Sequence, residues 1–266
     1  MISSATKQLS IILVNYRSEN NLLQCLLSLE RFLIDINHEI VIVNNDAEEF
    51  LLEIKKNFPQ AVIIEQKENV GFGRAINAGA EISEGEILFI LNPDTEILDD
   101  LNPIVEILEK NPEIGAVGPK LLGENGKIQE WSTGVEISFL DLIRNNLGLP
   151  RSKKIWESLA TRETYWISGA ALFIPREIFL QMGGFDENFF MYFEDNDLCR
   201  RIRGVGKKLL YFPEVAIRHW GGKSSQDSQK QKQYFFASQD YYFQKHFGSV
   251  QVFWLKLLRT IFLKGK

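Results

Sequence analysis

The run Ile87–Leu91, followed directly by Asn92, Pro93 and Asp94, constrains the fold more than any other stretch. Consecutive apolar residues that end at turn-forming residues are typical of a central strand buried on both faces of a sheet. Pro93 ends the strand, because proline lacks the N–H that a ladder hydrogen bond needs. The strand therefore delivers Asn92 and Asp94 to its carboxyl end, the edge at which open α/β sheets bind ligands.

Asp94 has two interpretations. A carboxylate with an amide two residues before it could hold a divalent cation against the phosphates of a substrate. Alternatively, Asp94 only caps a helix that begins near Asp99, since Asn, Pro and Asp are also common turn residues. The motifs elsewhere in the chain favour the cation site.

The first hundred residues alternate between strand and helix patterns. Apolar runs predict strands at 9–14, 39–43, 61–65 and 86–91, with helices near 19–34, 47–57 and 72–83. This alternation specifies right-handed crossovers and a mostly parallel sheet flanked by helices, an α/β scaffold suited to nucleotides. A helix near 100–110 and a strand at 115–117 follow, whereas 135–163 shows no legible pattern.

Composition excludes several classes of protein. The chain of 266 residues is 45% hydrophobic and can bury a large core. A net charge of −5 argues against a nucleic-acid binder. Cys25 and Cys199 lie too far apart in sequence to indicate a disulfide framework or a zinc site. With no pattern of a signal peptide or a membrane span near the N-terminus, a cytoplasmic location is expected.

Polar residues follow each early strand. Tyr16 follows the first, Asn45 and Asp46 follow the second, and Asn69 follows the third. In a parallel sheet these positions share one edge with Asp94 and converge on one crevice. Each cluster alone also fits a structural role, because loops need polar residues in any case.

The stretch from Asn69 to Gly79 contains Gly71 and Gly73 before a helix, which invites comparison with dinucleotide folds. We reject that interpretation, because Ile76 stands where the third glycine belongs and the motif follows the third strand instead of the first. The glycines are expected to let the helix start pack tightly beside a ligand pocket. Arg74 either neutralises a diphosphate or faces solvent.

Three acids, Glu194, Asp195 and Asp197, open a predicted helix after the aromatic run Phe189–Phe193. Acids at a helix N-terminus can serve only as favourable partners of the macrodipole. Three acids in four positions exceed that requirement. An apolar cleft would raise the pKa of one of them toward the value that a general base needs.

Two further strands carry candidate residues. The predicted strand 166–174 contains Gly169, and a strand glycine often marks a close approach by a ligand. The last predicted strand, from Val215, ends at His219 and Trp220, before a loop through Ser228. His219 is either a structural histidine or a functional one at a strand end.

In order and spacing, these motifs resemble the family 2 glycosyltransferases of the GT-A fold, most closely the rhamnosyltransferase-like members that build bacterial surface polysaccharides. The resemblance spans roughly residues 9–222. It rests on the Asn45 turn, Asn69–Gly73 with Asn77, Asn92-Pro93-Asp94, and Gly184-Phe185-Asp186 through Glu194-Asp195 to His219. It implies a GT-A domain over 1–240, with a nucleotide-binding half of about 1–118 and an acceptor half, α+β in character, of about 119–240.

The resemblance also implies an inverting transferase that uses Mg²⁺ or Mn²⁺, a nucleotide sugar (dTDP-rhamnose preferred over UDP-hexoses) and a saccharide or lipid-linked acceptor. Asp94 and His219 would hold the metal, and Asp195, supported by Glu194, would be the catalytic base. Asn92 replaces the first Asp of the family's Asp-x-Asp triplet and offers only a neutral oxygen; Asn44 likewise stands where relatives commonly have Asp. The implied donor-binding residues are Tyr16, Asn45, Asp46, Asn69, Gly71, Arg74, Asn92 and Asp94, and the implied acceptor-binding residues are Gly169, Asp197 and Trp220.

The segment 241–266 contains five Lys and Arg residues and no acid, with apolar residues at helical spacing. It predicts a basic amphipathic helix. One role is peripheral contact with the inner face of an anionic cytoplasmic membrane, and the alternative is a homodimer contact or packing on the domain itself.

Two other functions compete. A sugar-phosphate nucleotidyltransferase would need a glycine-rich loop after the first strand, and Asn15–Ser18 contains no glycine. A catalytically weak sugar-nucleotide-binding subunit is compatible with Asn44 and Asn92, but Asp195 and His219 weigh against it.

Overall fold

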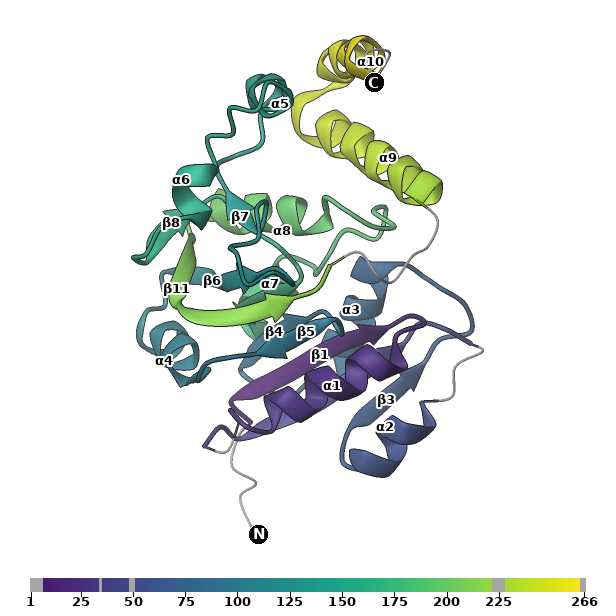
Figure 1. Cartoon of the computed structure of the whole chain (residues 1–266), viewed down its shortest axis with the longest axis vertical. Coiled ribbons are helices and arrows are strands. Elements are labelled where there is room, and N and C mark those ends of the chain that lie inside the picture. The colour runs from purple at the N-terminus through teal and green to yellow at the C-terminus, as the bar shows by residue number, and fades with distance from the viewer. Residues whose placement is uncertain (1–6, 34, 48–50, 222–227, 264–266) are drawn as a thin grey trace.

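The computed structural model describes residues 7–33, 35–47, 51–221 and 228–263 (Figure 1). Across these residues a nine-stranded sheet has the order β3-β2-β1-β4-β10-β6-β11-β5, with β8 added beside β11 and a separate β7–β9 pair. The strands are β1 Leu9–Asn15, β2 His38–Asn44, β3 Val62–Glu65, β4 Ile87–Leu91, β5 Thr95–Ile97, β6 Ile114–Leu122, β7 Thr133–Gly134, β8 Arg162–Thr164, β9 Trp166–Ile167, β10 Ala171–Pro175 and β11 Lys208–His219.

Helices cover both faces of this sheet, and the predicted α/β class with a mostly parallel, helix-flanked sheet is confirmed. The helices are α1 Glu19–Leu29, α2 Leu52–Asn57, α3 Phe72–Ile82, α4 Asn102–Lys110, α5 Phe139–Asn146, α6 Lys153–Trp156, α7 Arg176–Gln181, α8 Glu194–Gly204, α9 Ser228–Phe247 and α10 Ser249–Leu263. The helix expected at 47–57 is α2, which begins at Leu52, and residues 48–50 lie outside the described residues.

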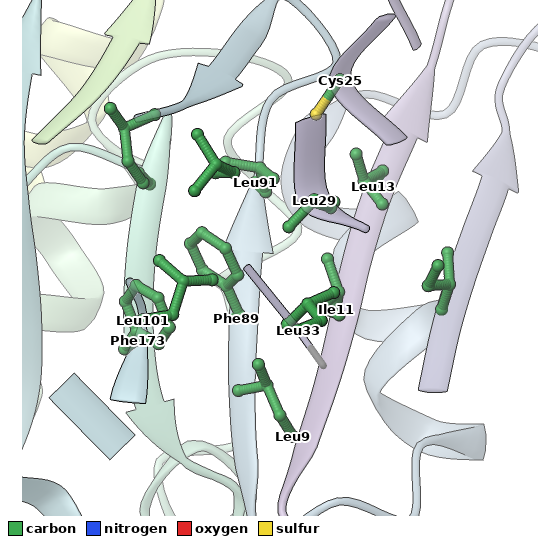
Figure 2. Packing of buried hydrophobic residues seen from close by; sticks show 14 of the residues in the cluster. Leu9, Ile11, Leu13, Cys25, Leu29, Leu33, Phe89, Leu91, Leu101 and Phe173 are labelled. Carbon is green, nitrogen blue, oxygen red and sulfur yellow. The ribbon is translucent and has the colours of Figure 1, made fainter. Parts of the chain in front are cut away.

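Alternation along the central strands places a core on each face of the sheet. Ile11 and Leu13 of β1 pack with α1 and α4, whereas Ile12 and Val14 face α3 and α8. Figure 2 shows the first of these clusters, in which Phe89 of β4 stacks on Phe173 of β10 at 3.8 Å between ring centroids. Because β4 is buried on both faces, its apolar run has no polar alternation.

The second half of the sheet differs from a simple parallel arrangement. β10 runs antiparallel to β4 and β6, and β5 runs antiparallel to β11. The strand expected at 166–174 is two strands, β9 and β10, and the expected last strand is the end of the longer β11. Since β5 follows Asp94 directly and α4 begins only at Asn102, the interpretation of Asp94 as a helix cap is wrong.

The region without legible pattern contains α5, which begins with a capping box. The Ser138 side chain accepts a hydrogen bond from the Asp141 N–H, and the Asp141 carboxylate accepts one from the Ser138 N–H. This reciprocal pairing satisfies two backbone donors that a helix start leaves unpaired.

The basic segment forms parts of two helices instead of one. Gly248, at φ +86°, ends α9 and turns the chain into α10. The predicted boundary at 240/241 falls inside α9. Both helices pack on a third apolar cluster that contains Phe189, Phe193 and Tyr242. In the described parts of the chain, none of the helices has the length and apolar character that crossing a membrane requires.

Candidate functional site

The carboxyl ends of β1, β2 and β3 meet in a row of polar side chains. Asn15 pairs in register with Asn44, and Asn44 with Glu65. The Asn15 amide donates to Asn44 Oδ1 at 3.0 Å, and the Asn44 amide donates to Glu65 Oε2 at 2.7 Å. Asn44 therefore links the Asn15 amide to the Glu65 carboxylate along the sheet edge that the sequence predicted.

Asn45 organises the glycine loop before α3. Its Oδ1 accepts from the Val70 N–H at 3.0 Å, and its amide donates to Asn69 Oδ1 at 2.9 Å. Gly71 follows at φ +89°, and a Cβ there would meet the Phe190 carbonyl oxygen at 2.5 Å. The expected tight packing of the glycine loop is confirmed. Gly71 packs against Phe190, which lies in the loop before Glu194 and Asp195.

Three other predicted donor-side residues have charged or aromatic partners. Asp46 is buried and accepts from Arg17 Nε at 3.1 Å, and the Arg17 guanidinium lies over the half-buried Tyr16 ring. Arg74 instead donates to the carboxylate of Glu187 at 3.0 Å, and both side chains are about half exposed. The structure thus gives Arg74 a solvent-facing ion pair, as the second interpretation of this residue predicts.

Asn92, Asp94 and His219 converge at the end of β4. His219 Nε2 lies 3.3 Å from Asp94 Oδ1 and 3.3 Å from the Asn92 amide nitrogen. Pairing of Thr95 with His219 across β5 and β11 brings these residues together, and Trp220 donates its N–H to the Asp94 carbonyl. Both Asp94 and His219 are buried.

Gln129 is a site residue that the sequence did not indicate. Its Oε1 lies 2.9 Å from His219 Nδ1. An amide oxygen accepts a hydrogen bond, so Nδ1 donates to Gln129, and Nε2 is the ring nitrogen that faces Asn92 and Asp94. No local motif marks Gln129 as a partner of a distant histidine.

The residues around His219 fit a divalent cation. A carboxylate, an imidazole nitrogen and an amide are ligand types that Mn²⁺ and Mg²⁺ accept, and such ions commonly retain substrate phosphates and water as further ligands. Gln129 fixes the imidazole in the way that outer partners of metal ligands do. Within the described residues, no cluster of three or more His, Cys, Asp or Glu side chains could hold a metal.

Asp195 lies beside this group, at the start of α8. Its Oδ2 accepts from the Gly169 N–H at 3.0 Å, and its Oδ1 accepts from the Asn196 N–H at 2.7 Å. The next residue, Ala170, accepts the Asn92 N–H at 2.9 Å, so a short backbone path joins Asp195 to the Asp94 group. Burial raises the pKa of Asp195, and the hydrogen bonds from Gly169 and Asn196 oppose that rise.

Glu194 is buried next to Asp195. Burial, together with the charge of Asp195, raises the pKa of Glu194 to about 8. Among the described residues its Oε2 has no hydrogen-bond partner. Tyr192 and Phe193 before it both adopt positive φ, +72° and +66°, a conformation that non-glycine residues rarely hold unless packing imposes it. Burial thus raises the pKa of both acids, and only Asp195 has hydrogen-bond donors, from Gly169 and Asn196, that oppose the rise.

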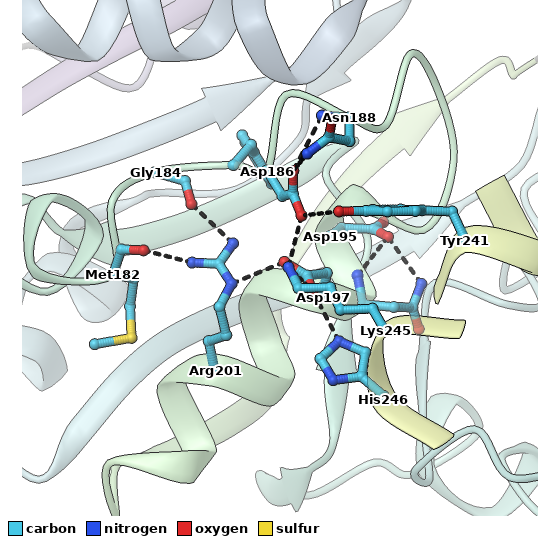
Figure 3. A network of polar contacts seen from close by, with 12 residues as sticks. Met182, Gly184, Asp186, Asn188, Asp195, Asp197, Arg201, Tyr241, Lys245 and His246 are labelled. Atoms are coloured by element: carbon cyan, nitrogen blue, oxygen red, sulfur yellow. Dashed lines mark hydrogen bonds and ion pairs between the residues drawn. The ribbon is translucent and has the colours of Figure 1, made fainter. Parts of the chain in front are cut away.

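Asp197 has a different role from the acceptor contact implied by resemblance. Its side chain is fully buried, and its oxygens accept from Arg201, Lys245 and His246, each at 2.7 Å (Figure 3). Burial alone would raise the pKa of Asp197, but the hydrogen bonds from His246 and Lys245 lower it. With both oxygens engaged, Asp197 anchors α8 to α9 and is not open to an acceptor.

Asp186 extends this network, which sequence reasoning missed. Its Oδ2 accepts from Lys245 at 2.6 Å and from the Tyr241 hydroxyl at 3.0 Å. Burial would raise the pKa of Asp186, but the bonds from Lys245 and Asn188 hold it well below its usual range. Figure 3 shows Lys245 between the two carboxylates, so α9 bridges the start of α8 and the preceding loop.

The order of strands, the polar edge and the carboxylate–imidazole pair define the GT-A class of folds. The model of the family named Glycosyl transferase family 2 matches residues 10–166. The chain belongs to this family.

Curated relatives have names from polysaccharide synthesis. N-acetylglucosaminyl-diphospho-decaprenol L-rhamnosyltransferase of Mycobacterium tuberculosis is 24% identical over 62% of this chain, and the match covers 60% of that protein. Rhamnosyltransferase WbbL of Escherichia coli is 26% identical over 52% of this chain and 53% of its own length. The O-antigen biosynthesis protein RfbC of Myxococcus xanthus is 28% identical over 68% of this chain and only 15% of its own length. The chain thus corresponds to little more than half of the two rhamnosyltransferases.

Solved structures share the fold at low identity. The mannosyltransferase PcManGT from Pyrobaculum calidifontis, in complex with GDP-Man and Mn²⁺, has a TM-score of 0.61 at 17% identity, covering 91% of this chain and 64% of that one. GalNAc-T7 with UDP, GalNAc and Mn²⁺ has a TM-score of 0.60 at 17% identity, covering 91% and 50%. These similarities confirm the GT-A fold.

Proposed function

We propose that the chain is an inverting, metal-dependent glycosyltransferase that moves a sugar from a nucleoside-diphosphate donor to a saccharide or lipid-linked acceptor. The pathway would be synthesis of a bacterial surface polysaccharide, on the cytoplasmic side of the membrane. The names of the relatives favour dTDP-rhamnose as the donor. The solved neighbours with Mn²⁺ favour a divalent cation.

One observation carries this proposal: the Asp94–His219 pair and Asp195 lie at neighbouring positions, joined through Asn92, Ala170 and Gly169. Asp94 and His219 would hold the cation, with Asn92 beside them. When bound, the cation supplies positive charge that stabilises the departing diphosphate.

Asp195 performs the proton transfer in this mechanism. The Gly169 and Asn196 donors orient its carboxylate and stabilise the charged form, while burial raises its pKa and so favours taking a proton. It removes the proton of the acceptor hydroxyl as that oxygen attacks the anomeric carbon. The oxygen enters opposite to the leaving diphosphate, so the configuration inverts and no covalent enzyme intermediate forms. Glu194, whose pKa burial raises to about 8, would in its protonated form present a hydrogen-bond donor beside the reacting centre.

The test is release of nucleoside diphosphate from a panel of sugar nucleotides that includes dTDP-rhamnose, UDP-glucose and GDP-mannose. Each is incubated with the chain and Mn²⁺ or Mg²⁺, with EDTA as the control, and donor binding is screened in parallel by thermal shift. We expect metal-dependent release from one donor class. Binding without release from any donor would instead support a catalytically weak binding subunit, and pyrophosphate-dependent formation of sugar phosphate would indicate a nucleotidyltransferase.

A further inference from the structure

The outer side of α10 carries large apolar side chains in solvent. Val250, Phe253, Trp254 and Leu257 are 71%, 63%, 49% and 43% exposed. Their spacing places them on one face of the helix. Single exposed apolar residues are common on protein surfaces, but four large ones on one helix face are not.

The neighbouring helix α5 extends the same surface. Leu140 of α5 and Leu147 directly after it are each 61% exposed, and Leu149 is 67% exposed. α5 contacts α10, and Figure 1 shows the two helices side by side at the end of the molecule farthest from the N-terminus. We name this surface the apical face; it consists of Leu140, Leu147, Leu149, Val250, Phe253, Trp254 and Leu257.

The apical face is additional to the apolar residues that fold these helices. Phe139 and Leu142 of α5, with Val252 and Leu255 of α10, already pack inward on the cluster that contains Tyr242. The outward residues therefore contribute nothing to that core. Several large apolar side chains exposed on two helices that touch are typical of an interaction site.

The charges beside the apical face are mainly positive. Arg144 of α5 and Lys256 of α10 are 46% and 61% exposed. The acid nearest Lys256 is Asp240 of α9, which also pairs with Arg259, so the cations there outnumber the acid. Asp141, the acid of α5, is buried and paired with Arg151, and the sequence of α10 contains no Asp or Glu. In a chain whose net charge is −5, this end is selectively cationic.

We propose that the apical face docks on the surface of an anionic lipid bilayer. The apolar side chains enter the boundary between headgroups and acyl chains, and the flanking cations contact anionic headgroups. Trp254 suits this boundary, because its ring is apolar and its N–H remains hydrated. A second copy of the chain is a poorer partner, since a two-fold interface would bring the same cations together from both sides.

Docking would also position the acid cluster. α10 continues from α9, whose Lys245 and His246 bind Asp197 of α8. A bilayer under the apical face would therefore hold Asp195 at a fixed distance from the lipid surface, where an acceptor attached to a lipid presents its hydroxyl.

The experiment is flotation of the full chain with vesicles, without sugar nucleotide. Vesicles of phosphatidylcholine are compared with vesicles in which a third of the lipid is phosphatidylglycerol. The chain should float with the anionic vesicles, with a blue shift of tryptophan fluorescence. The double variant F253S/W254S should lose at least about tenfold in partitioning, and R144E/K256E should lose binding that depends on phosphatidylglycerol.

L52S/V62S is the matched control, since Leu52 and Val62 are 70% and 43% exposed on α2 and β3, away from the apical face. It should float like the unaltered chain. Equal flotation of F253S/W254S and the control, or no flotation of the unaltered chain, would overturn the proposal. A dimer in sedimentation velocity that F253S/W254S disperses, without vesicle binding, would assign the face to a second copy. Because no donor is present, loss of transfer activity cannot be mistaken for any of these results.

Discussion

Two neighbouring regions of the molecule are held together by different chemistry. The first, the donor edge, is the set of loops at the strand ends where a donor is proposed to bind; the second, the acid cluster, is Glu194, Asp195 and Asp197 at the start of α8. At the ends of β1 and β2, neutral amides hold the loops, as when Asn45 binds the backbone at Val70 and the side chain of Asn69. At α8, a buried charge does so, with Asp197 accepting from Arg201, Lys245 and His246. Neutral hydrogen bonds contribute modestly and tolerate change, whereas a buried charge fixes its neighbours because leaving it unpaired is costly.

This difference gives the two regions different tasks. An edge of amides can accept a nucleotide without a large change in its own electrostatics. The charged anchor, which is Asp197 with Arg201, Lys245 and His246, instead fixes the start of α8. That helix start carries Glu194 and Asp195, the residues proposed to act in catalysis.

The largest expected effect belongs to D195N. Asparagine keeps the size of the side chain but cannot accept the acceptor's proton, so transfer should fall about a thousandfold. Donor binding, measured by calorimetry with Mn²⁺, should remain close to that of the unaltered chain. Retained turnover would show that Asp195 is not the base. It would also contradict the assignment of donor binding to the strand ends and of catalysis to the acids of α8.

A stability experiment tests the charged anchor. D197N leaves Arg201, Lys245 and His246 facing a neutral amide, and we expect a loss of about 3 kcal/mol in the free energy of unfolding, measured by urea denaturation. The control is R74M, which breaks the exposed Arg74–Glu187 pair and should cost less than about 0.5 kcal/mol. Equal losses in the two variants would mean that the buried network is no more important than a surface ion pair.

The pH dependence of stability tests Glu194. In the folded chain its pKa is raised from 4.5 to about 8, so the folded state retains a proton that the unfolded state releases. The unfolded state then binds fewer protons between these values, and stability falls as pH rises from about 5 to 8. The contribution of this single group is at most about 1.4 kcal/mol per pH unit.

E194Q removes this titration and should flatten the profile of unfolding free energy from pH 5 to pH 8. A variant with the slope of the unaltered chain would show that Glu194 is already ionised at neutral pH. In that case the acid side would hold two charges, and the assignment of one base and one protonated neighbour would be wrong.

The donor half of the fold could be predicted because its signals are local. Apolar runs such as Ile87–Leu91 fix the strands, and parallel pairing brings their ends together, which is how Asp94 was placed. β5 escaped prediction because its three residues are ordered by pairing with distant β11. The break between α9 and α10 at Gly248 was missed because no sequence pattern around this glycine marks it as the end of a helix.

In the candidate site, too, residues marked by local motifs were predicted and contacts made by distant residues were missed. Asp94 and His219 were predicted to lie together, and the structure places them 3.3 Å apart. That Asp195 shares a cavity with them stays a prediction; its carboxylate binds the Gly169 N–H, and the next residue, Ala170, accepts the Asn92 N–H. The anchor was missed because His246 is 49 residues from Asp197 and Lys245 is 59 residues from Asp186. Asp197 looked like an acceptor ligand only while its partners were unknown. Tertiary packing, not periodicity, determines those contacts.

The smallest expected effect concerns Gln129, whose side-chain oxygen contacts His219, 90 residues away in the sequence. Q129L removes the oxygen that keeps the His219 proton on Nδ1, so Nε2 is no longer reserved for a cation. We expect affinity for a nucleoside diphosphate to fall about tenfold in Mn²⁺ and to remain unchanged in EDTA, by calorimetry. Q129N, which shortens the amide, should fall between Q129L and the unaltered chain. An equal loss in EDTA would instead make Gln129 a structural support of the β6–β7 loop, and the Asp94–His219 pair would need no partner to orient it.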